Sequence, residues 1–269
     1  MRPVAAAGAF DDLRSRHVRF LQEAAKLGPV HVALWDDEAV RVLTGRAPEF
    51  PCEEREYVLA AIRHVARVSV VRAAAADELP AIGGAAPAAW AMPDGEDSAE
   101  RRAFCAARGI EALVFGEKDL RGFPELPPPA RGAGMRVIVT GCYDWFHSGH
   151  VRFFEEAAGL GDLYVVVGSD ANVRLLKGAG HPLMPEDERR YMVQSVRHVA
   201  QALISSGEGW MDAAPEIERI EPQIYAVNED GDRPEKREFC RAHGLEYVVL
   251  ARAPKEGLPR RTSTDLRGY

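Results

Sequence analysis

Two histidines separated by two residues stand out in the segment GCYDWFHSGH, residues 141–150. His147 and His150 would lie on the first turn of a helix, where imidazoles at this spacing can face the same phosphate. The free backbone N–H groups at the start of a helix also attract anions. Gly149, between the two histidines, keeps a side chain away from closely approaching phosphate oxygens. The segment therefore predicts a phosphate-binding site.

The elements around this segment predict how it is held. The β-branched run at 136–140 indicates a buried strand, and a helix is expected from Ser148 to Gly159 or Gly161. Further strands are expected at 163–167, 202–204, 223–227 and 247–250, with helices at 186–199, 213–220 and 234–243. Strands that alternate with helices form a doubly wound α/β domain, whose parallel sheet binds ligands at the carboxyl ends of its strands. The phosphate-binding segment would lie at that edge.

The chain repeats itself. The stretch GAFDDLRSRHVRFLQEAAKLGPVHVALWDD, from Gly8, lies without a gap over GCYDWFHSGHVRFFEEAAGLGDLYVVVGSD, from Gly141. After one inserted residue the match continues, for example with RHVA in each half and with FC followed by G-[IL]-E in each. A period this long marks two duplicated domains rather than a solenoid. We expect domains at 1–124 and 135–269, joined by a Pro- and Gly-rich linker at 125–134.

The two motifs together, G-x-[FY]-D-x-[FL] followed by H-x-G-H, resemble those of the cytidylyltransferase-like nucleotidyltransferases. This family includes glycerol-3-phosphate, phosphocholine and phosphoethanolamine cytidylyltransferases and the adenylyltransferase that makes ADP-heptose. The resemblance covers residues 136–267 and, in weaker form, the first half. It implies an α/β protein with two tandem doubly wound, Rossmann-like nucleotidyltransferase domains.

The resemblance also implies which residues form the site. Lys177, in the run VRLLKG, and Arg261, in the run RTST, would join His147 and His150 as catalytic residues. The remaining nucleotide-binding positions that it implies are Gly141, Cys142, Tyr143, Asp144, Phe146, Gly149, Asn228, Glu229, Asp230, Thr262, Ser263 and Thr264. Two segments depart from the family pattern. Arg261 directly precedes the hydroxyl residues, and the turn at 228–230 replaces a Gly-Asp-Asp-like turn.

The chemistry implied is direct transfer of a nucleoside monophosphate. An acceptor phosphate is largely dianionic at pH 7, because its second pKa is about 6, so it needs no general base. The site would align it with the α-phosphorus of a nucleoside triphosphate and stabilise the departing pyrophosphate. The two imidazoles would donate hydrogen bonds, and Lys177 and Arg261 would supply positive charge. Mg²⁺ is expected to bind through the substrate phosphates, without a set of protein ligands of its own.

The nucleotide and the acceptor stay open from sequence. The run RYMVQ at 190–194 is similar to the phospholipid-precursor cytidylyltransferases, whereas Gly141-Cys142 and the run at 169–178 are similar to the ADP-heptose enzymes. We expect transfer of CMP from CTP to a sugar, polyol or amino-alcohol phosphate, with ATP and a sugar or heptose phosphate as the alternative. Asp144 either caps its turn or belongs to the site, and Trp210 either packs or lines an acceptor pocket.

The first repeat has lost most of the phosphate contacts. Arg14, Arg16 and Thr44 stand at the positions of the first histidine, the intervening glycine and the lysine, and His17 is what remains of the histidine pair. We predict that this domain is catalytically inactive and serves as an internal partner in place of a second subunit, with further homodimerisation open. A regulatory nucleotide pocket is the alternative.

Composition narrows the class of function. A net charge of −7 leaves no basic footprint for nucleic acid, which argues against the tRNA binding that an isolated H-x-G-H would allow. No apolar run approaches the roughly 18 residues of a membrane span, the N-terminus lacks the apolar region of a signal peptide, and the 4 cysteines have no zinc-site spacing. We expect a cytoplasmic enzyme that acts away from membranes. A non-catalytic nucleotide-binding regulatory protein is the alternative from another class.

Overall fold

The chain divides into two units, Met1–Gly122 and Phe123–Tyr269, each with a parallel sheet of its own. The computed structural model describes residues 2–83, 86–127, 134–262 and 266. The expected boundary after residue 124 lies close to the division between the units. Most of the expected linker, residues 128–133, falls outside the described residues.

The first unit contains a five-stranded sheet in the order β3-β2-β1-β4-β5. Its strands are β1 (Val4–Gly8), β2 (Val30–Trp35), β3 (Val65–Val71), β4 (Ala89–Pro93) and β5 (Glu111–Phe115). Its helices are α1 (Ser15–Ala25), α2 (Asp37–Thr44), α3 (Cys52–Ala61) and α4 (Ala99–Arg108), with a 3₁₀ turn, η1, at Asp94–Glu96. All of the strand pairs are parallel, as the alternation of strands and helices predicts.

The second unit repeats this plan with the order β10-β9-β6-β7-β8. Its strands are β6 (Arg136–Gly141), β7 (Asp162–Val167), β8 (Val199–Ile204), β9 (Ile224–Asn228) and β10 (Glu246–Leu250). Its helices are α5 (Ser148–Ala158), α6 (Asp170–Lys177), α7 (Glu186–Gln194), α8 (Ala214–Ile220) and α9 (Pro234–His243), with 3₁₀ turns η2 (Gly209–Met211) and η3 (Glu229–Gly231). In both units the first strand is central and the order reverses between the first and fourth strands, which confirms two tandem doubly wound domains.

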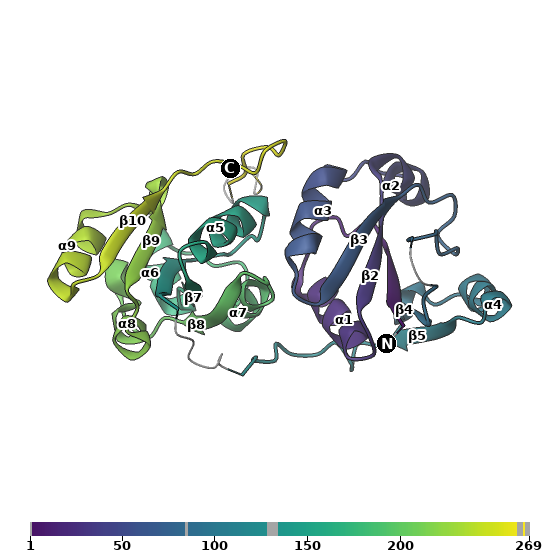
Figure 1. The fold of residues 1–269 in the computed structure, drawn as a ribbon, viewed down its shortest axis with the longest axis horizontal. Helices are drawn as coiled ribbons and strands as arrows, with labels where there is room; N and C mark the ends of the chain where they lie inside the picture. The colour runs from purple at the N-terminus through teal and green to yellow at the C-terminus, as the bar shows by residue number, and fades with distance from the viewer. Residues whose placement is uncertain (1, 84–85, 128–133, 263–265, 267–269) are drawn as a thin grey trace. The chain divides into compact units, whose positions relative to one another are not determined.

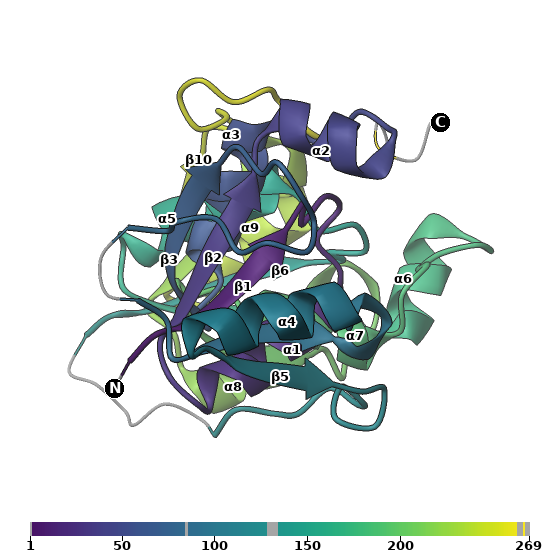
Figure 2. The same ribbon diagram turned by 90° about the vertical axis from the view of Figure 1, so that its right-hand side faces the viewer.

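Helices cover both faces of the second sheet (Figure 1), and Figure 2 shows the same ribbon turned by 90°. The face under α8 and α9 packs Ile217, Ile220 and Cys240 onto Ile138 and Tyr225. Side chains alternate between the faces of a strand, so the neighbouring positions of β6 and β7 face α5 and α7. Figure 1 shows α5 and α7 together on that opposite side. The buried faces fix the register of the strands and thereby the position of the loops at their carboxyl ends.

Two expectations about the helices differ from the structure. The helix expected at 186–199 ends at Gln194, and residues 195–198 form a turn before Val199 starts β8. Val196 and Val199 are both buried, so the apolar pattern continues across the turn and hides the end of the helix. α6 was not expected as a helix. It is short, and Leu175 at its centre is 65% exposed, which leaves no clear apolar stripe.

In the part of the chain that the structure describes, none of the helices has the length and apolar character needed to cross a bilayer.

Candidate active site

The two histidines of the sequence motif stack on one another at the start of α5. Their ring centroids lie 3.9 Å apart, with the ring planes 21° from parallel. His147 is the N-cap residue, and its Nδ1 accepts a hydrogen bond of 3.1 Å from the backbone N–H of Gly149. This bond holds the imidazole against the end of the helix, where backbone N–H groups and the helix dipole favour an anion. The sequence expectation that both imidazoles face one phosphate is compatible with this geometry.

Aromatic side chains pack against His150, which is half-buried. The ring of Tyr143 lies edge-on to it at 5.2 Å, and the ring of Phe146 lies at 5.8 Å. Burial holds the pKa of His150 well below its usual value, and the positive charges of Arg252 and Lys177 lower it further. Within the described residues its Nδ1 is buried and lacks a hydrogen-bond partner. The imidazole is therefore neutral at pH 7, with an unsatisfied nitrogen that a phosphate oxygen can satisfy.

Two glycines permit close packing in the loop between β6 and α5. A β-carbon on Gly149 would lie 2.9 Å from Cε1 of His147, and one on Gly141 would lie 2.7 Å from Cζ of Tyr143. Both distances are too short for real contacts. Tyr143 itself has a left-handed φ of 54°, and Phe10 in the first unit has the corresponding φ of 45°. The same strained loop is thus built in both units, which indicates that packing around it determines its shape.

Positive groups reach the histidines from two other parts of the chain. Lys177 is exposed at the end of α6, and its charge acts on both His150 and Cys142. The carbonyl oxygen of Arg261 lies 3.5 Å from the position that a β-carbon on Gly149 would take, and it accepts a hydrogen bond of 3.3 Å from Arg252 Nη2. The charge of Lys177 thus reaches His150, and the backbone of Arg261 lies close to Gly149, while the phosphate contacts expected of the two side chains stay predictions.

The C-terminal hydroxyls are described only in part. Thr262 follows Arg261, and its carbonyl oxygen accepts a hydrogen bond from the backbone N–H of Leu266. Ser263 and Thr264, which were expected to bind the nucleotide, lie outside the described residues. Their positions therefore stay predictions.

The turn after β9 contributes one charged contact to the site. Asp230 forms an ion pair with Arg252, while Glu229 is exposed beside it in η3. Asn228 ends β9 in register with Leu250 of β10, and Arg252 follows Leu250 by two residues. Asp230 therefore positions the arginine whose charge reaches His150. Base contacts by this turn stay a prediction.

Asp144 ties the motif loop to a loop that lies forty residues further along the chain. Its Oδ1 accepts hydrogen bonds of 2.7 and 2.9 Å from the backbone N–H groups of Leu183 and Met184. Asp11, at the equivalent position of the first unit, accepts the same pair of bonds from residues 49 and 50. Since the first unit keeps this contact without the histidine pair, Asp144 shapes the loop, and a carboxylate there would repel a phosphate at short range.

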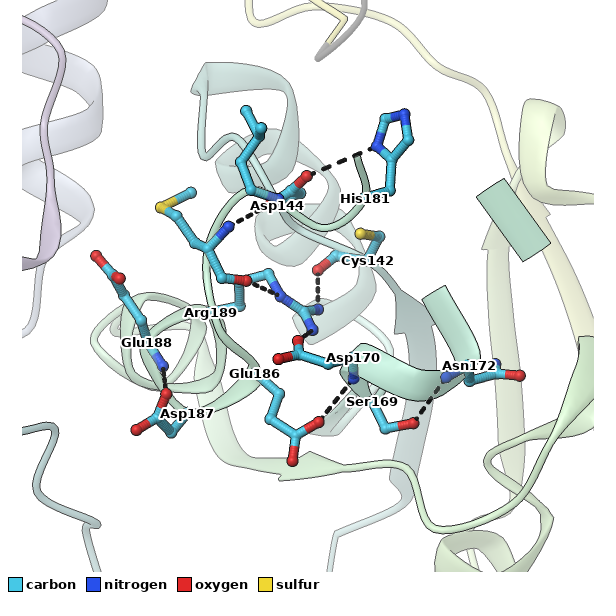
Figure 3. A network of polar contacts seen from close by, with 12 residues as sticks. Cys142, Asp144, Ser169, Asp170, Asn172, His181, Glu186, Asp187, Glu188 and Arg189 are labelled. Carbon is cyan, nitrogen blue, oxygen red and sulfur yellow. Dashed lines mark hydrogen bonds and ion pairs between the residues drawn. The ribbon is translucent and has the colours of Figure 1, made fainter. Parts of the chain in front are cut away.

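Arg189 holds the same loop in place through hydrogen bonds to two carbonyl oxygens and an ion pair with Asp170 (Figure 3). It is fully buried, and its guanidinium donates to the carbonyl oxygens of Cys142 and Met184 and to the carboxylate of Asp170. Arg55 of the first unit makes the corresponding bonds to Ala9, Phe50 and Asp37, with a further bond to Trp35. Planar guanidinium groups suit such multiple fixed contacts. The framework of the loop is therefore common to both units, although the phosphate contacts are not.

Sequence reasoning missed Arg252 and Arg189. Arg252 belongs to no motif, and only the folding of the C-terminal segment onto α5 brings it to the site. Arg189 did align with Arg55 in the internal repeat, which was a usable signal, because an arginine retained in both halves has a structural role in each. Trp210, left open by the sequence, is 46% exposed with the guanidinium of Arg233 lying 5.0 Å over its ring.

The first unit has filled the space that the second leaves open. Trp35 ends β2 at the position that aligns with Gly168, the residue directly after β7, and its side chain packs in a cluster with Val40 and Ala73. Arg14, at the position of the first histidine, forms an ion pair of 2.6 Å with Asp12. An indole in the nucleotide crevice and an arginine that already has a carboxylate partner both argue against a second phosphate site.

In the described part of the chain, no group of three or more histidine, cysteine or acidic side chains could hold a metal ion. Asp144 and Asp170, the carboxylates around the motif loop, are engaged by backbone N–H groups and by Arg189. Binding of Mg²⁺ through the substrate phosphates, with its own waters, stays a prediction.

Several known proteins are similar to this chain in amino-acid sequence. A family model described as cytidylyltransferase-like matches residues 138–259. The FAD synthase of Ferroglobus placidus is 38% identical over 124 residues, which are 45% of this chain and 78% of that protein. The FAD synthase of Aciduliprofundum boonei is 38% identical over 137 residues, 50% of this chain and 85% of that protein. The bifunctional protein HldE of Methylococcus capsulatus is 40% identical over 104 residues, 38% of this chain and 21% of that protein.

The chain belongs to the cytidylyltransferase-like family. It is a nucleotidyltransferase, and the residues that match the family model lie within the second unit.

Proposed function

We propose that the second unit transfers the adenylyl group of ATP to the phosphate of a small phosphorylated acceptor, with FMN as the first acceptor to test. The observation that carries this proposal is the stacked pair of His147 and His150 at the start of α5, with the charges of Lys177 and Arg252 directed at it. The expectation of CTP from sequence gives way to ATP here. FAD synthases, which are among the relatives, form a product that joins AMP to FMN.

The reaction needs no proton abstraction. An oxygen of the dianionic acceptor phosphate attacks the α-phosphorus of ATP and forms a new P–O bond. The bond from the α-phosphorus to the bridging oxygen of the departing pyrophosphate breaks. His150, neutral in the free enzyme, donates one N–H to a phosphate oxygen, and the negative charge of that oxygen raises the pKa of the imidazole. His147 is held for the same task by the N–H of Gly149. Mg²⁺ bound to the triphosphate would neutralise part of the charge on the β- and γ-oxygens.

The experiment is a pyrophosphate-release screen. ATP, CTP, GTP and UTP are each combined with FMN and with sugar, heptose, polyol and amino-alcohol phosphates in the presence of Mg²⁺, and products are identified by mass. We expect ATP to be the preferred nucleotide and FAD to be the product with FMN. His147→Ala should lose about 10²–10³ in turnover, whereas Arg14→Ala, at the matched position of the first unit, should keep full activity. A clear preference for CTP, or full activity of His147→Ala, would refute the proposal.

We also propose that the first unit is non-catalytic and binds no nucleotide. Trp35 occupies the crevice position, Arg14 is paired with Asp12, and Thr44 stands where the lysine is needed. Calorimetric titration of the full chain with a non-hydrolysable ATP analogue should give one site per chain, and Lys177→Ala should weaken that one site. A second site that survives this substitution would contradict the proposal. The predicted role of this unit as an internal partner stays a prediction.

A further inference from the structure

A buried lysine lies at the point where the strand order of the second sheet reverses. Lys236, on the first turn of α9, is 8% exposed, and its Nζ lies 3.4 Å from Oγ1 of Thr140. Thr140 is on β6, one residue before the motif loop begins at Gly141. β6 and β9 are the neighbours between which the order reverses, and the crevice at such a reversal is where doubly wound sheets bind ligands.

The first unit shows what a purely structural cation looks like at this place. Arg101 of α4 is the counterpart of Lys236, because the helices align through Phe104 and Phe239. The guanidinium of Arg101 lies 5.1 Å over the ring of Trp90, 2.7 Å from a carboxylate oxygen of Glu96 and 3.4 Å from one of Asp77. That cation is fully neutralised by its own unit.

The second unit retains only part of this neutralisation, because Nζ of Lys236 lies 5.8 Å from the centroid of the Tyr225 ring but lacks the close carboxylates of Arg101. Gly231 stands at the position of Glu96, and Asp212 alone remains as the counterpart of Asp77. Among the described residues Lys236 forms no ion pair, and its contact with Thr140 is its one hydrogen bond. Burial lowers the pKa of Lys236, while the charge of Asp212 acts in the opposite direction. A buried ammonium with unused donors is costly unless a partner arrives.

Hydroxyl groups have replaced apolar atoms around this lysine. Tyr225 stands at the position of Trp90, and its hydroxyl lies 2.9 Å from Oγ1 of Thr140, where the first unit has Ala7. The hydroxyl of Tyr143 is also buried and lacks a hydrogen-bond partner within the described residues, and it interacts electrostatically with Tyr225. Its counterpart, Phe10, has no hydroxyl. The second unit has thus gained a polar lining in which the Tyr143 hydroxyl lacks a partner among the described residues.

The crevice is continuous with the motif loop. A β-carbon on Gly168 would lie 3.6 Å from Oδ2 of Asp212 and 3.8 Å from the carbonyl oxygen of Gly141. Asp212 accepts hydrogen bonds from Ser205 and Asn172, so its carboxylate already has partners besides the lysine. A ligand between Lys236 and the loop would therefore reach the α-phosphate position from the side opposite α5.

We propose that Lys236 binds the phosphate of the acceptor, with the Tyr143 hydroxyl as a second donor to it. This inference rests on the proposed function and names the residue that selects a phosphorylated acceptor. The histidine side of the loop would hold the triphosphate, and Lys236 would bring the second anion into line with the α-phosphorus. An acceptor without a phosphate would leave the buried ammonium unpaired, so the site rejects it.

The test separates the two substrates kinetically. With the best acceptor of the pyrophosphate-release screen, Lys236→Met should raise the KM for the acceptor by about 10- to 100-fold while the KM for ATP stays within about twofold. Lys236→Arg should restore part of the affinity. The matched variant, Arg101→Met, should lower the melting temperature through its stranded carboxylates and leave both KM values unchanged.

Tyr143→Phe is a second variant, and it should fold normally because Phe10 occupies the same loop position in the first unit with a similar φ. It should raise the KM for the acceptor by about three- to tenfold without loss of thermal stability. If both variants keep the wild-type acceptor KM, or if they raise both KM values equally, Lys236 does not bind the acceptor. If the wild-type protein transfers AMP to none of the phosphates, the proposed function itself fails and this inference falls with it.

Discussion

A single methyl group at Gly149 should separate the stability of this protein from its activity. Gly149 is the second residue of α5 and has no need of a left-handed φ, so alanine there suits the helix and stabilises it by up to about 1 kcal/mol. The same β-carbon would lie 2.9 Å from Cε1 and 3.0 Å from Nδ1 of His147, which is too close for any real contact. A side chain moves more easily than a helix, so the imidazole rotates away.

The magnitude of the loss follows from what that rotation breaks. It removes the 3.1 Å hydrogen bond from the Gly149 N–H to Nδ1 and separates the stacked rings of His147 and His150. Loss of one preorganised donor from a site that stabilises developing charge costs about 10²–10³ in turnover, or roughly 3–4 kcal/mol in the barrier. Gly149→Ala should therefore have an unchanged or higher melting temperature and about one-hundredth of the wild-type kcat.

The assay is pyrophosphate release under saturating ATP and acceptor, with thermal unfolding measured on the same samples. Arg16→Ala is the control, because it leaves the same methyl side chain at the equivalent position of the first unit. No imidazole stands two residues before this position. Arg16→Ala should have wild-type activity. Full activity of Gly149→Ala would show that the position of the first imidazole does not matter to the reaction, and the reasoning about the stacked pair would be refuted.

Three further predictions follow from the structure. Lys177→Ala should raise the KM for ATP by about tenfold or more with no change in stability, because the side chain is exposed and its charge reaches His150; an unchanged KM in steady-state kinetics would contradict this. Arg189→Met and Arg55→Met should each cost about 3 kcal/mol in urea unfolding, but only the first should abolish pyrophosphate release; equal activities would place the reaction elsewhere. Burial lowers the pKa of His17 to about 4, so the unfolded chain binds more protons than the folded one between pH 6.5 and pH 4, and stability falls as the pH falls through that range. The loss in the free energy of unfolding should be about 2 kcal/mol at pH 5. A His17→Asn variant with the same pH dependence of unfolding would disprove this explanation.

The sequence by itself determined the duplication and the fold class, and it predicted the location of the phosphate site. These features are encoded locally: the internal match keeps its register, the alternation of apolar runs follows the period of each element, and the H-x-G-H segment lies directly between β6 and α5. The sequence predicted the ends of the helices less accurately. The helix expected at 186–199 ended early because buried valines continue past it, and α6 has too short an apolar face to reveal itself.

Only the tertiary structure decided which side chains act together. Arg252 reaches His150 from a hundred residues away, and Lys236 reaches Thr140 across 96 positions, because β9 and β10 lie on the far side of β6 in the sheet. The neutrality of His150 is likewise a product of burial by the aromatic rings around it, which no spacing of letters records. Asp144 illustrates the same limit: its motif suggests a ligand contact, but its partners are two backbone N–H groups of a distant loop. Sequence periodicity reports the local conformation of the backbone, whereas charge, solvation and contact depend on what the completed fold brings near.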